Sequence, residues 1–398
     1  MGDPPQFDLG HIGRGGVSVT PVIKGWCPGA LRPMLSGDGL VVRLRVPQGR
    51  LTVAQARGVA DLARRYGNGV IDLSNRANLQ LRGVDPERHE GLIDALRALA
   101  LIDVDEGAER RRNLMVTPFW QAGGDTEHLT QQLTAAAESH ALPEVSNKFG
   151  YAVDAGLQPV LQADPADIRF ERSAEGQLLL CAEGAALGKL ISRDAAVTEA
   201  IALAAWVRAQ GASRAARALE AGATLPSGFD HPRQSGLGTP ALGHYPAGAL
   251  VACAFGQMDA ETLTALADLG PLRLTPWRMV LIEGATALPD LPGLITEAAD
   301  PLLRVIACTG APGCAQGRGE TRELARHLAD VVPKGQHLHV SGCAKGCAAP
   351  RATDFTLTAT APDQYDLIRN GRAEAAPDLR GLTPAAIASH LRKSADAP

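Results

Sequence analysis

The segment IDLSNRANLQLRGV, residues 71–84, returns without a gap as LRLTPWRMVLIEGA, residues 272–285. Each copy is preceded by an alternating segment, residues 39–47 and 248–256, and by a segment of helical periodicity. A unit of strand, helix and hairpin that occurs twice favours two half-domains related by a pseudo-twofold axis. A chance likeness between two short α/β units is the alternative.

The strands of the first unit separate a polar from an apolar face. Apolar residues alternate with polar ones in residues 39–47 and again in NLQLRGV, residues 78–84. If helices cover the apolar face, the opposite face presents donors that suit several carboxylates, bound bidentately. A solvated face of an antiparallel sheet is the alternative. The residues of this polar face are Arg43, Arg45, Asn78, Gln80 and Arg82, with Arg76 at the hairpin turn.

A second pattern contains four of the seven cysteines. They occur as two pairs in Gly-rich segments, CTGAPGC at residues 308–314 and SGCAKGCAAP at residues 341–350. Four thiolates from two such loops suit a [4Fe–4S] cluster, whose sulfides accept hydrogen bonds from closely approaching backbone N–H groups. The predicted ligands are Cys308, Cys314, Cys343 and Cys347.

Structural zinc is the main alternative for these cysteines. Zinc pairs usually have two to four residues between the ligands, and the gaps here are five and three, with no histidine inside either pair. Disulfides fit poorly with an odd number of cysteines and no secretory signal. Zinc in a binding protein without chemistry, and free or oxidised thiols, remain the other interpretations.

Composition indicates an ordinary globular protein. The 398 residues are 45% hydrophobic and 21% charged, which is enough for two or three domains with their own cores. A net charge of −4 and 4% aromatic residues give no basis for nucleic-acid or anionic-membrane binding. The segment MGDPPQFDLGHIGRGG has no apolar core, so we expect no signal peptide and a cytoplasmic location.

The region between the two repeats has an α/β pattern of its own. Helices are expected over residues 126–140 and 194–221, and strands around a loop in residues 142–156. Residues 227–240 are rich in Gly, Pro and Ser, which predicts a linker. Cys181 and Cys253 fall in strand patterns and are expected in the core.

The cysteine pairs resemble those of the sirohaem nitrite and sulfite reductases, which hold a [4Fe–4S] cluster with a C-x5-C and a C-x3-C pair. The resemblance extends over about residues 24–382. SNRANLQL is similar to a turn whose arginine faces the substrate, which points to Arg76. RRNLMV and SNKFGYAVD are similar to two further active-site segments and point to Arg112 and Lys148.

This resemblance implies an α+β fold, with two ferredoxin-like half-domain repeats and two α/β reductase-type domains around a central cleft for a tetrapyrrole. The expected boundaries are residues 20–103 for the first half-domain, 104–235 for the first α/β domain, 236–290 for the second half-domain and 291–398 for the Fe–S-binding domain.

Two departures make the chain more similar to the precorrin-3B synthases of aerobic cobalamin synthesis. Lys345 stands where the reductases have asparagine, and Gly150 stands where the sulfite enzymes have a second lysine. Fewer cations suit a small oxyanion less well. The CPG at Cys27, followed by ALRPM and GDG, is also similar to the synthases. This resemblance implies hydroxylation of precorrin-3A at C20 by O2 with γ-lactone formation; a sirohaem-dependent sulfite or nitrite reductase is the alternative.

The predicted cofactor is the [4Fe–4S] cluster, with a mononuclear non-haem iron as a further candidate and sirohaem only under the reductase alternative. No facial triad identifies iron ligands, although His11 and His244 lie in loop segments. No nicotinamide fingerprint is present, so electrons, ultimately from a reductant such as NADH, should arrive through another protein. Trp277 is expected to pack at a turn, and the catalytic residues are unknown. The predicted substrate contacts are Arg43, Arg45, Arg76, Asn78, Gln80, Arg112, Lys148 and Arg278.

Overall fold

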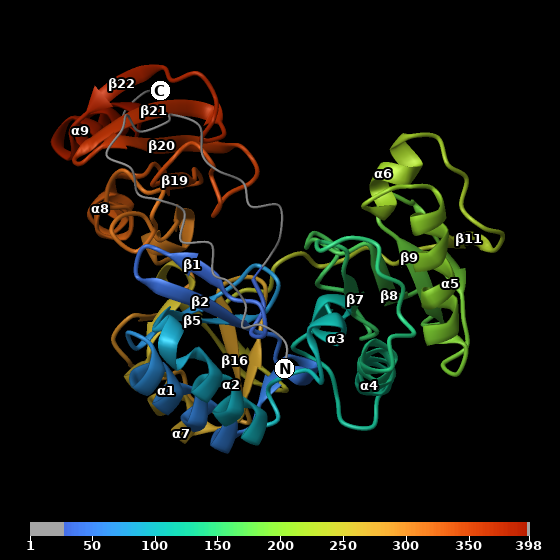
Figure 1. Cartoon of the computed structure of the whole chain (residues 1–398). Helices are drawn as coiled ribbons and strands as arrows, with labels where there is room; N and C mark the ends of the chain where they lie inside the picture. Colours follow the sequence, from blue (N-terminus) through green and yellow to red (C-terminus); the bar gives the residue numbers. More distant parts are fainter. Residues whose placement is uncertain (1–27, 396–398) are drawn as a thin grey trace.

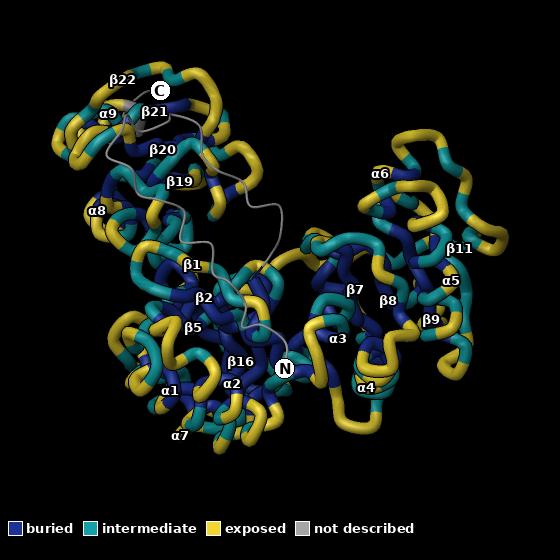
Figure 2. Tube along the Cα trace, viewed as in Figure 1, coloured by how far each residue is buried: buried dark blue, intermediate teal, exposed yellow. Residues whose placement is uncertain are grey.

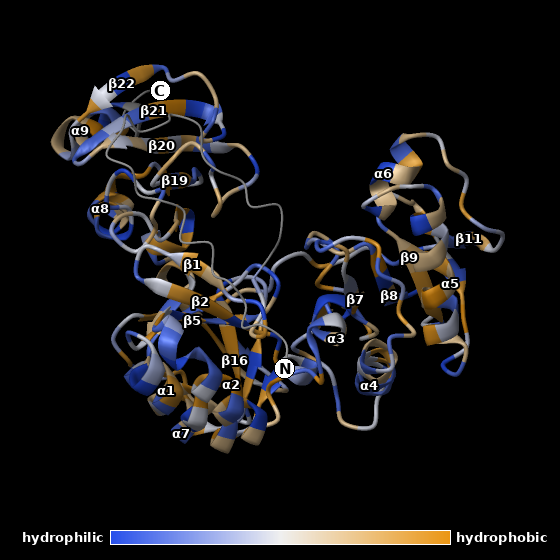
Figure 3. Ribbon diagram, viewed as in Figure 1, coloured by the Kyte–Doolittle hydropathy of each residue, from blue (hydrophilic) through white to orange (hydrophobic). Residues whose placement is uncertain are grey.

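The computed structural model describes residues 28–395, and Figure 1 shows their arrangement. His11 and Cys27 lie outside these residues. Within them the chain forms four β-sheets: two in a pair of half-domains, one in a middle domain and one in a C-terminal domain. Buried residues follow the strands of the sheets (Figure 2), and the hydrophobic residues of β2 and β16 mark the apolar interior of the half-domains (Figure 3).

The first half-domain has a five-stranded antiparallel sheet with helices packed on one face. Its helices are α1 (Val53–Tyr66) and α2 (His89–Ala98). Thr52 and Gln55 form a capping box that fixes the start of α1. The strands, in spatial order, are β1 (Met34–Ser36), β2 (Gly39–Leu44), β5 (Leu79–Val84), β4 (Val70–Leu73) and β14 (Gln257–Asp259).

The second half-domain repeats this order. Its helix α7 (Ala260–Leu269) is capped by Asp259, which accepts a hydrogen bond from Thr262 N–H. A short strand, β17 (Leu294–Ile295), also pairs with β13. The strands, in spatial order, are β12 (Gly243–Tyr245), β13 (Gly248–Cys253), β16 (Met279–Glu283), β15 (Leu272–Leu274) and β3 (Arg50–Leu51).

The two half-domains exchange an edge strand. The short strand β3, from the first repeat, pairs with β15 of the second sheet, and β14, from the second repeat, pairs with β4 of the first sheet. The turns before the exchanged strands match, with positive φ at Gln48 (56°) and Phe255 (58°). The predicted internal repeat is therefore confirmed. Because of the exchange, residues 20–103 and 236–290 do not each contain a whole sheet.

The outer faces of the two sheets have different chemistry. Arg43 pairs with Gln80 in the first sheet, and at the corresponding place in the second sheet Leu250 pairs with Leu281. Those two leucines belong to the core that the second half-domain shares with the C-terminal domain. The second sheet is thus covered on both faces, whereas the first keeps a polar outer face.

The middle domain has a six-stranded mixed sheet and its own core. The predicted helix over residues 194–221 is two helices, because the chain turns at Gly211, whose φ is 65°. The predicted linker contains β11, which pairs with β10. Cys181 is buried on β9, as expected. The elements are α3 (Glu106–Arg111), β6 (Leu114–Val116), α4 (Asp125–Glu138), β7 (Tyr151–Val153), β8 (Ile168–Arg172), β9 (Leu178–Ala182), β10 (Leu187–Leu190), α5 (Ala196–Ala209), α6 (Ala215–Glu220) and β11 (Phe229–Pro232).

The C-terminal domain places both cysteine loops at one edge of its sheet. β18 (Val305–Ala307) and β19 (Leu338–Ser341) are parallel neighbours, and one cysteine loop follows each of them. The carboxyl ends of parallel neighbours meet at the same edge, which is where ligand sites of such sheets lie. The remaining elements are α8 (Arg322–Leu328), β20 (Thr353–Ala361), β21 (Gln364–Gly371), β22 (Leu379–Leu382) and α9 (Pro384–Ala395).

Five short 3-10 helices complete the described chain. They are η1 (Pro47–Gly49), η2 (Pro86–Arg88), η3 (Ala254–Gly256), η4 (Pro301–Arg304) and η5 (Ala329–Val331). Across residues 28–395, no helix combines the length and the apolar character that crossing a bilayer would require.

The exchanged strand β3 is held by a partly buried ion pair, which we expect to matter for stability. Glu283 on β16 accepts two bonds from Arg50 on β3, at 2.8 and 2.7 Å, and a third from Arg273. Glu283→Ala should therefore lower the free energy of unfolding by about 2–3 kcal/mol in chemical denaturation. Arg57→Ala breaks an exposed pair with Asp268 between α1 and α7 and should cost less than about 1 kcal/mol. Equal losses would show that the exchange does not depend on this pair.

Candidate functional site

The two cysteine loops lie in direct contact. Cys308 N–H donates to Val340 O at 3.3 Å, and Arg318 N–H donates to Gly342 O at 2.8 Å. Gly342 N–H in turn donates to the Cys308 sulfur at 3.2 Å. A Cβ at Gly342 would lie 2.9 Å from Gly310 Cα, so only glycine allows the two backbones to approach this closely. The loops therefore have the close backbone approach to sulfur that the sequence predicted.

The four cysteines influence one another electrostatically. Burial raises the pKa of the Cys343 and Cys347 thiols above their ordinary value, and the other cysteines raise it further. Lys345 lowers the pKa of Cys343, both through the hydrogen bond from its backbone N–H and through the charge of its ammonium group. Thiols of this kind stay protonated until a metal displaces the proton. Four sulfurs from two loops are the donor set of an iron–sulfur cluster and also of a four-cysteine zinc site. The four side chains are not gathered around a single ion in the described residues.

No group of three or more His, Cys, Asp or Glu side chains in residues 28–395 is arranged to hold a single metal ion. His244, one of the two histidines noted for a non-haem iron, is exposed on β12 within this range. The mononuclear iron therefore has no set of three such ligands within residues 28–395.

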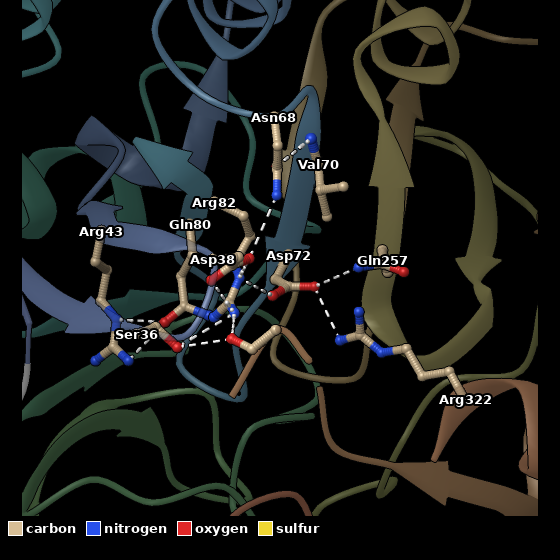
Figure 4. Close-up of polar contacts among 11 residues, drawn as sticks. Ser36, Asp38, Arg43, Asn68, Val70, Asp72, Gln80, Arg82, Gln257 and Arg322 are labelled. Atoms are coloured by element: carbon tan, nitrogen blue, oxygen red, sulfur yellow. Dashed lines mark hydrogen bonds and ion pairs between the residues drawn. The ribbon is translucent and has the colours of Figure 1, made fainter. Parts of the chain in front are cut away.

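A row of polar side chains crosses the outer face of the first sheet. Four neighbouring strands each contribute one residue to this row, in the order Arg43, Gln80, Asp72 and Gln257. Arg43 donates to Gln80 Oε1 from Nε and Nη2, at 3.1 and 2.8 Å, and Gln257 donates to Asp72 at 3.4 Å (Figure 4). Arg43 and Gln80 are only partly buried, which leaves them able to meet a ligand. The structure thus brings these two predicted contacts together.

Arg82 has a different role from the one predicted for the polar face. Its guanidinium donates to both Asp38 oxygens, at 3.1 and 2.8 Å (Figure 4). It also donates to the carbonyl of Gly313 at 2.7 Å. Ser36 Oγ donates to the same carbonyl at 2.8 Å. The Arg82 side chain is only 7% exposed. It is therefore engaged by the first cysteine loop rather than presented to a ligand.

Arg45 and Arg112 also differ from the prediction, because both are buried inside the protein. Arg112 forms a two-point pair with Asp103, including a bond of 2.9 Å, and donates to Arg45 O at 2.6 Å. Arg45 donates to the carbonyl of Glu109. Burial lowers the pKa of Arg45 to about 10, although Glu109 opposes this shift. Both guanidinium groups hold the junction of the first half-domain with α3, which covers this end of the sheet.

The hairpin turn brings Arg76 and Lys148 together from distant parts of the sequence. Arg76 donates to Lys148 O at 3.1 Å, and the Lys148 side chain is exposed. Asn78 is buried, and its N–H donates to Ser74 Oγ at 3.1 Å. Arg76 and Lys148 thus remain suited to a ligand at the border of the middle domain, whereas Asn78 belongs to the turn.

The equivalent turn of the second repeat contacts both flanking domains. Arg278 donates to Ala348 O, in the second cysteine loop, at 3.1 Å. Burial, and then the neighbouring Arg322, lower the pKa of Arg278 to about 10. Trp277 Nε1 donates to Asp164 at 2.9 Å. The predicted carboxylate contact of Arg278 is thus replaced by a bond to the cysteine loop, because the C-terminal domain covers this turn.

His339 and Asp164 are two residues of this region that no sequence pattern indicates. His339 lies on β19 below the second cysteine loop, is fully buried, and has no hydrogen-bond partner at either ring nitrogen among the described residues. Burial, with a contribution from Arg278, lowers its pKa to about 4, so the imidazole is neutral at pH 7. In the sequence, LHV and QADPAD have the patterns of an ordinary strand and an ordinary loop.

The burial of Asp164 should make stability depend on pH. Burial raises the pKa of Asp164 from 3.8 to about 6, although Trp277 opposes the shift. Since the folded pKa lies above the unfolded one, this contribution is complete below about pH 4 and is lost as the pH passes about 6. Asp164→Asn should shrink the difference in unfolding free energy between about pH 4 and pH 7 by about 1–2 kcal/mol, after allowance for its partial exposure. An unchanged difference in denaturation experiments would contradict this assignment.

Arg112 should matter for stability rather than for ligand affinity. Arg112→Met leaves Asp103, which is 3% exposed, as a buried charge without its partner. The free energy of unfolding should fall by about 3–5 kcal/mol. Arg110→Met, which removes a partly exposed arginine two residues away, should cost less than about 1 kcal/mol. If the Arg112→Met protein were stable but bound its ligand more weakly, the prediction that Arg112 contacts the substrate would be restored.

Comparisons with known proteins agree with this architecture. Residues 32–99 match the family model described as the nitrite/sulfite reductase ferredoxin-like half domain. The chain is 28% identical to a precorrin-3B synthase from Sinorhizobium sp over 90% of this chain and 86% of that protein. It is also 28% identical to a ferredoxin–nitrite reductase from Synechococcus elongatus, over 82% of this chain and 77% of the other.

A solved structure extends the likeness to the fold. The NirA protein of Mycobacterium tuberculosis matches with a TM-score of 0.57 at 16% identity, covering 89% of this chain and 79% of that one. The predicted α+β fold with two ferredoxin-like half-domain repeats is confirmed by the sheets described above. With its paired half-domains and two flanking α/β domains, the chain has the fold of the NirA protein, and its sequence is similar to a precorrin-3B synthase and to a ferredoxin–nitrite reductase.

Proposed function

We propose that this protein is a precorrin-3B synthase, an oxidoreductase that uses O2 to hydroxylate C20 of precorrin-3A with formation of a γ-lactone. The observation that carries the proposal is the polar face of the first sheet, which presents Arg43 and Gln80 and leads, through Arg82, directly to a cysteine loop. The similarity to the Sinorhizobium precorrin-3B synthase over most of both chains supports the same activity. We place the reaction in the cytoplasm, where thiols stay reduced.

The four cysteines would hold a [4Fe–4S] cluster. Cys308 and Cys314 would bind it from one loop, and Cys343 and Cys347 from the other. The cluster supplies single electrons when it is bound. Those electrons would come from a separate donor protein that oxidises a reductant such as NADH. The glycines at the loop contact keep backbone N–H groups close to sulfur, which tunes the potential of such a site.

The chain's own side chains would bind and orient the substrate. A precorrin carries acetate and propionate groups around its rim, and guanidinium groups bind carboxylates bidentately. Arg43 has its guanidinium fixed by Gln80, so little freedom is lost when a carboxylate arrives. Arg76 and Lys148 would bind carboxylates at the border of the middle domain.

The surroundings of Gly150 favour the synthase over a reductase of small oxyanions. A Cβ built at Gly150 would lie 2.8 Å from Asn113 Nδ2 and 3.0 Å from Arg76 Nη1. The lysine that the sulfite enzymes have at this place would not fit without moving both neighbours. Arg76 instead occupies the space beside the chain, where it can meet a larger substrate.

The activity can be tested with protein purified without oxygen. Iron and acid-labile sulfide should be present, without zinc and without the Soret band of sirohaem. Incubation with precorrin-3A, a reductant and labelled O2 should incorporate an oxygen atom from O2 into the product, as measured by mass spectrometry. Copurified sirohaem together with reduction of sulfite or nitrite would favour the reductase instead. Zinc without iron would reject both enzymes.

Arg76→Ala should weaken substrate binding and leave the cluster in place. Loss of one charge-assisted contact should raise the dissociation constant for precorrin-3A by about 10- to 100-fold. The iron content and the cluster spectrum should not change, because the guanidinium of Arg76 bonds to the middle domain at Lys148 O. Arg97→Ala is a matched control, since Arg97 pairs with Asp94 on the exposed side of α2. Unchanged affinity in Arg76→Ala would exclude this face as the binding surface.

A further inference from the structure

Each of the two cysteine loops receives a hydrogen bond from one arginine of one half-domain. Arg82, on β5 of the first repeat, donates to Gly313 O, next to Cys314, at 2.7 Å. Arg278, at the turn of the second repeat, donates to Ala348 O, next to Cys347, at 3.1 Å. A carbonyl adjacent to the last cysteine of each loop is thus tied to a different half of the pseudo-symmetric pair.

Arg82 is itself held rigidly. Asp38 accepts two bonds from its guanidinium, and Ser36 shares the Gly313 carbonyl with it. Arg82 also lies 3.8 Å from Asp72. A planar guanidinium can bind a carboxylate and a carbonyl at the same time, which the single ammonium group of lysine cannot do in this geometry. The first cysteine loop is therefore fixed to the sheet through a preorganised donor.

The ion pairs around Arg82 and Arg278 contain more positive than negative charge. Asp72 pairs with Arg322 at 3.0 Å, and Arg322 is close enough to Arg278 to lower its pKa. Within residues 28–395, the carboxylates that pair with or act on Arg82, Arg278 and Arg322 in this network are those of Asp38 and Asp72. One positive charge is left in excess among these five largely buried side chains, two of which bond to the cysteine loops.

We infer that Arg82 and Arg278 are positioning residues for the cluster: they hold the two cysteine loops in register and compensate the negative charge of a thiolate-ligated cubane. The inference rests on the cluster proposed above. A nearby cation stabilises the reduced, more negative state of a cluster, so these arginines should raise its reduction potential. Because a cubane needs ligands from both loops, the loss of either arginine should weaken its retention.

Three variants separate the holding of the loops from the compensation of charge. Arg82→Met and Arg278→Met remove both, whereas Arg82→Lys keeps the charge and loses the forked geometry. In the Met variants, a ferrous chelator should remove iron about tenfold faster, and the midpoint potential should become more negative. Arg82→Lys should release iron faster while its potential stays close to that of the wild type. Arg57→Met, which changes an exposed pair far from the loops, is the control and should alter neither quantity.

A second measurement does not depend on the cluster. In metal-free protein, peptide mass spectrometry can follow alkylation of each cysteine by iodoacetamide. Cys314 should react several-fold faster in Arg82→Met, and the partly buried Cys343 in Arg278→Met, with the cysteines of the other loop little changed. Loop-specific acceleration in a protein that never contains iron would uphold the holding role and reject the proposed function. The inference would be overturned if both Met variants kept the wild-type rates of cysteine alkylation and of iron removal by the chelator, together with the wild-type midpoint potential.

Discussion

The reciprocal exchange of β3 and β14 is the constraint on which the rest of the structure depends. Each half-domain completes its sheet with a strand from the other, so neither sheet is whole until both repeats have folded. The exchange also places Gln257 from the second repeat in the polar row of the first sheet. The polar outer face of the first sheet is therefore built by both repeats, although its alternating pattern lies in the sequence of the first repeat alone.

The two half-domains have the same strand order but differ in the side chains on the outer faces of their sheets. Where the first sheet has Arg43 opposite Gln80, the second has Leu250 opposite Leu281. Apolar side chains at the second site contribute about 25 cal/mol for each Å2 of apolar surface that they bury, and they fix the C-terminal domain in place. That docking brings the cysteine loops to Arg82 and Arg278. One face thus anchors the domain that carries the sulfurs, and the other remains available for a ligand.

The repeat, the cysteine pairs and the sheet face of Arg43 and Gln80 could be predicted from the sequence, because alternation and spacing are local properties. Which arginines of that face stay accessible to a ligand could not be predicted. Arg45 follows the same alternation and Arg112 is indicated by the resemblance, but α3 and Asp103 bury both guanidinium groups. Arg82 has the right alternation, yet a loop 231 residues away takes its guanidinium. His339 and Asp164 carry no pattern at all, since their burial comes from domain packing.

The crowding around Gly150 couples this position to the placement of Arg76. A side chain at this position needs space that Asn113 and Arg76 already fill, so a single replacement by lysine creates a clash before it adds a useful charge. The Asn113 amide and the Arg76 guanidinium are the far ends of flexible side chains, so a larger residue at position 150 would fit only if both turned away. The missing side chain at residue 150 thereby determines where the guanidinium of Arg76 can lie.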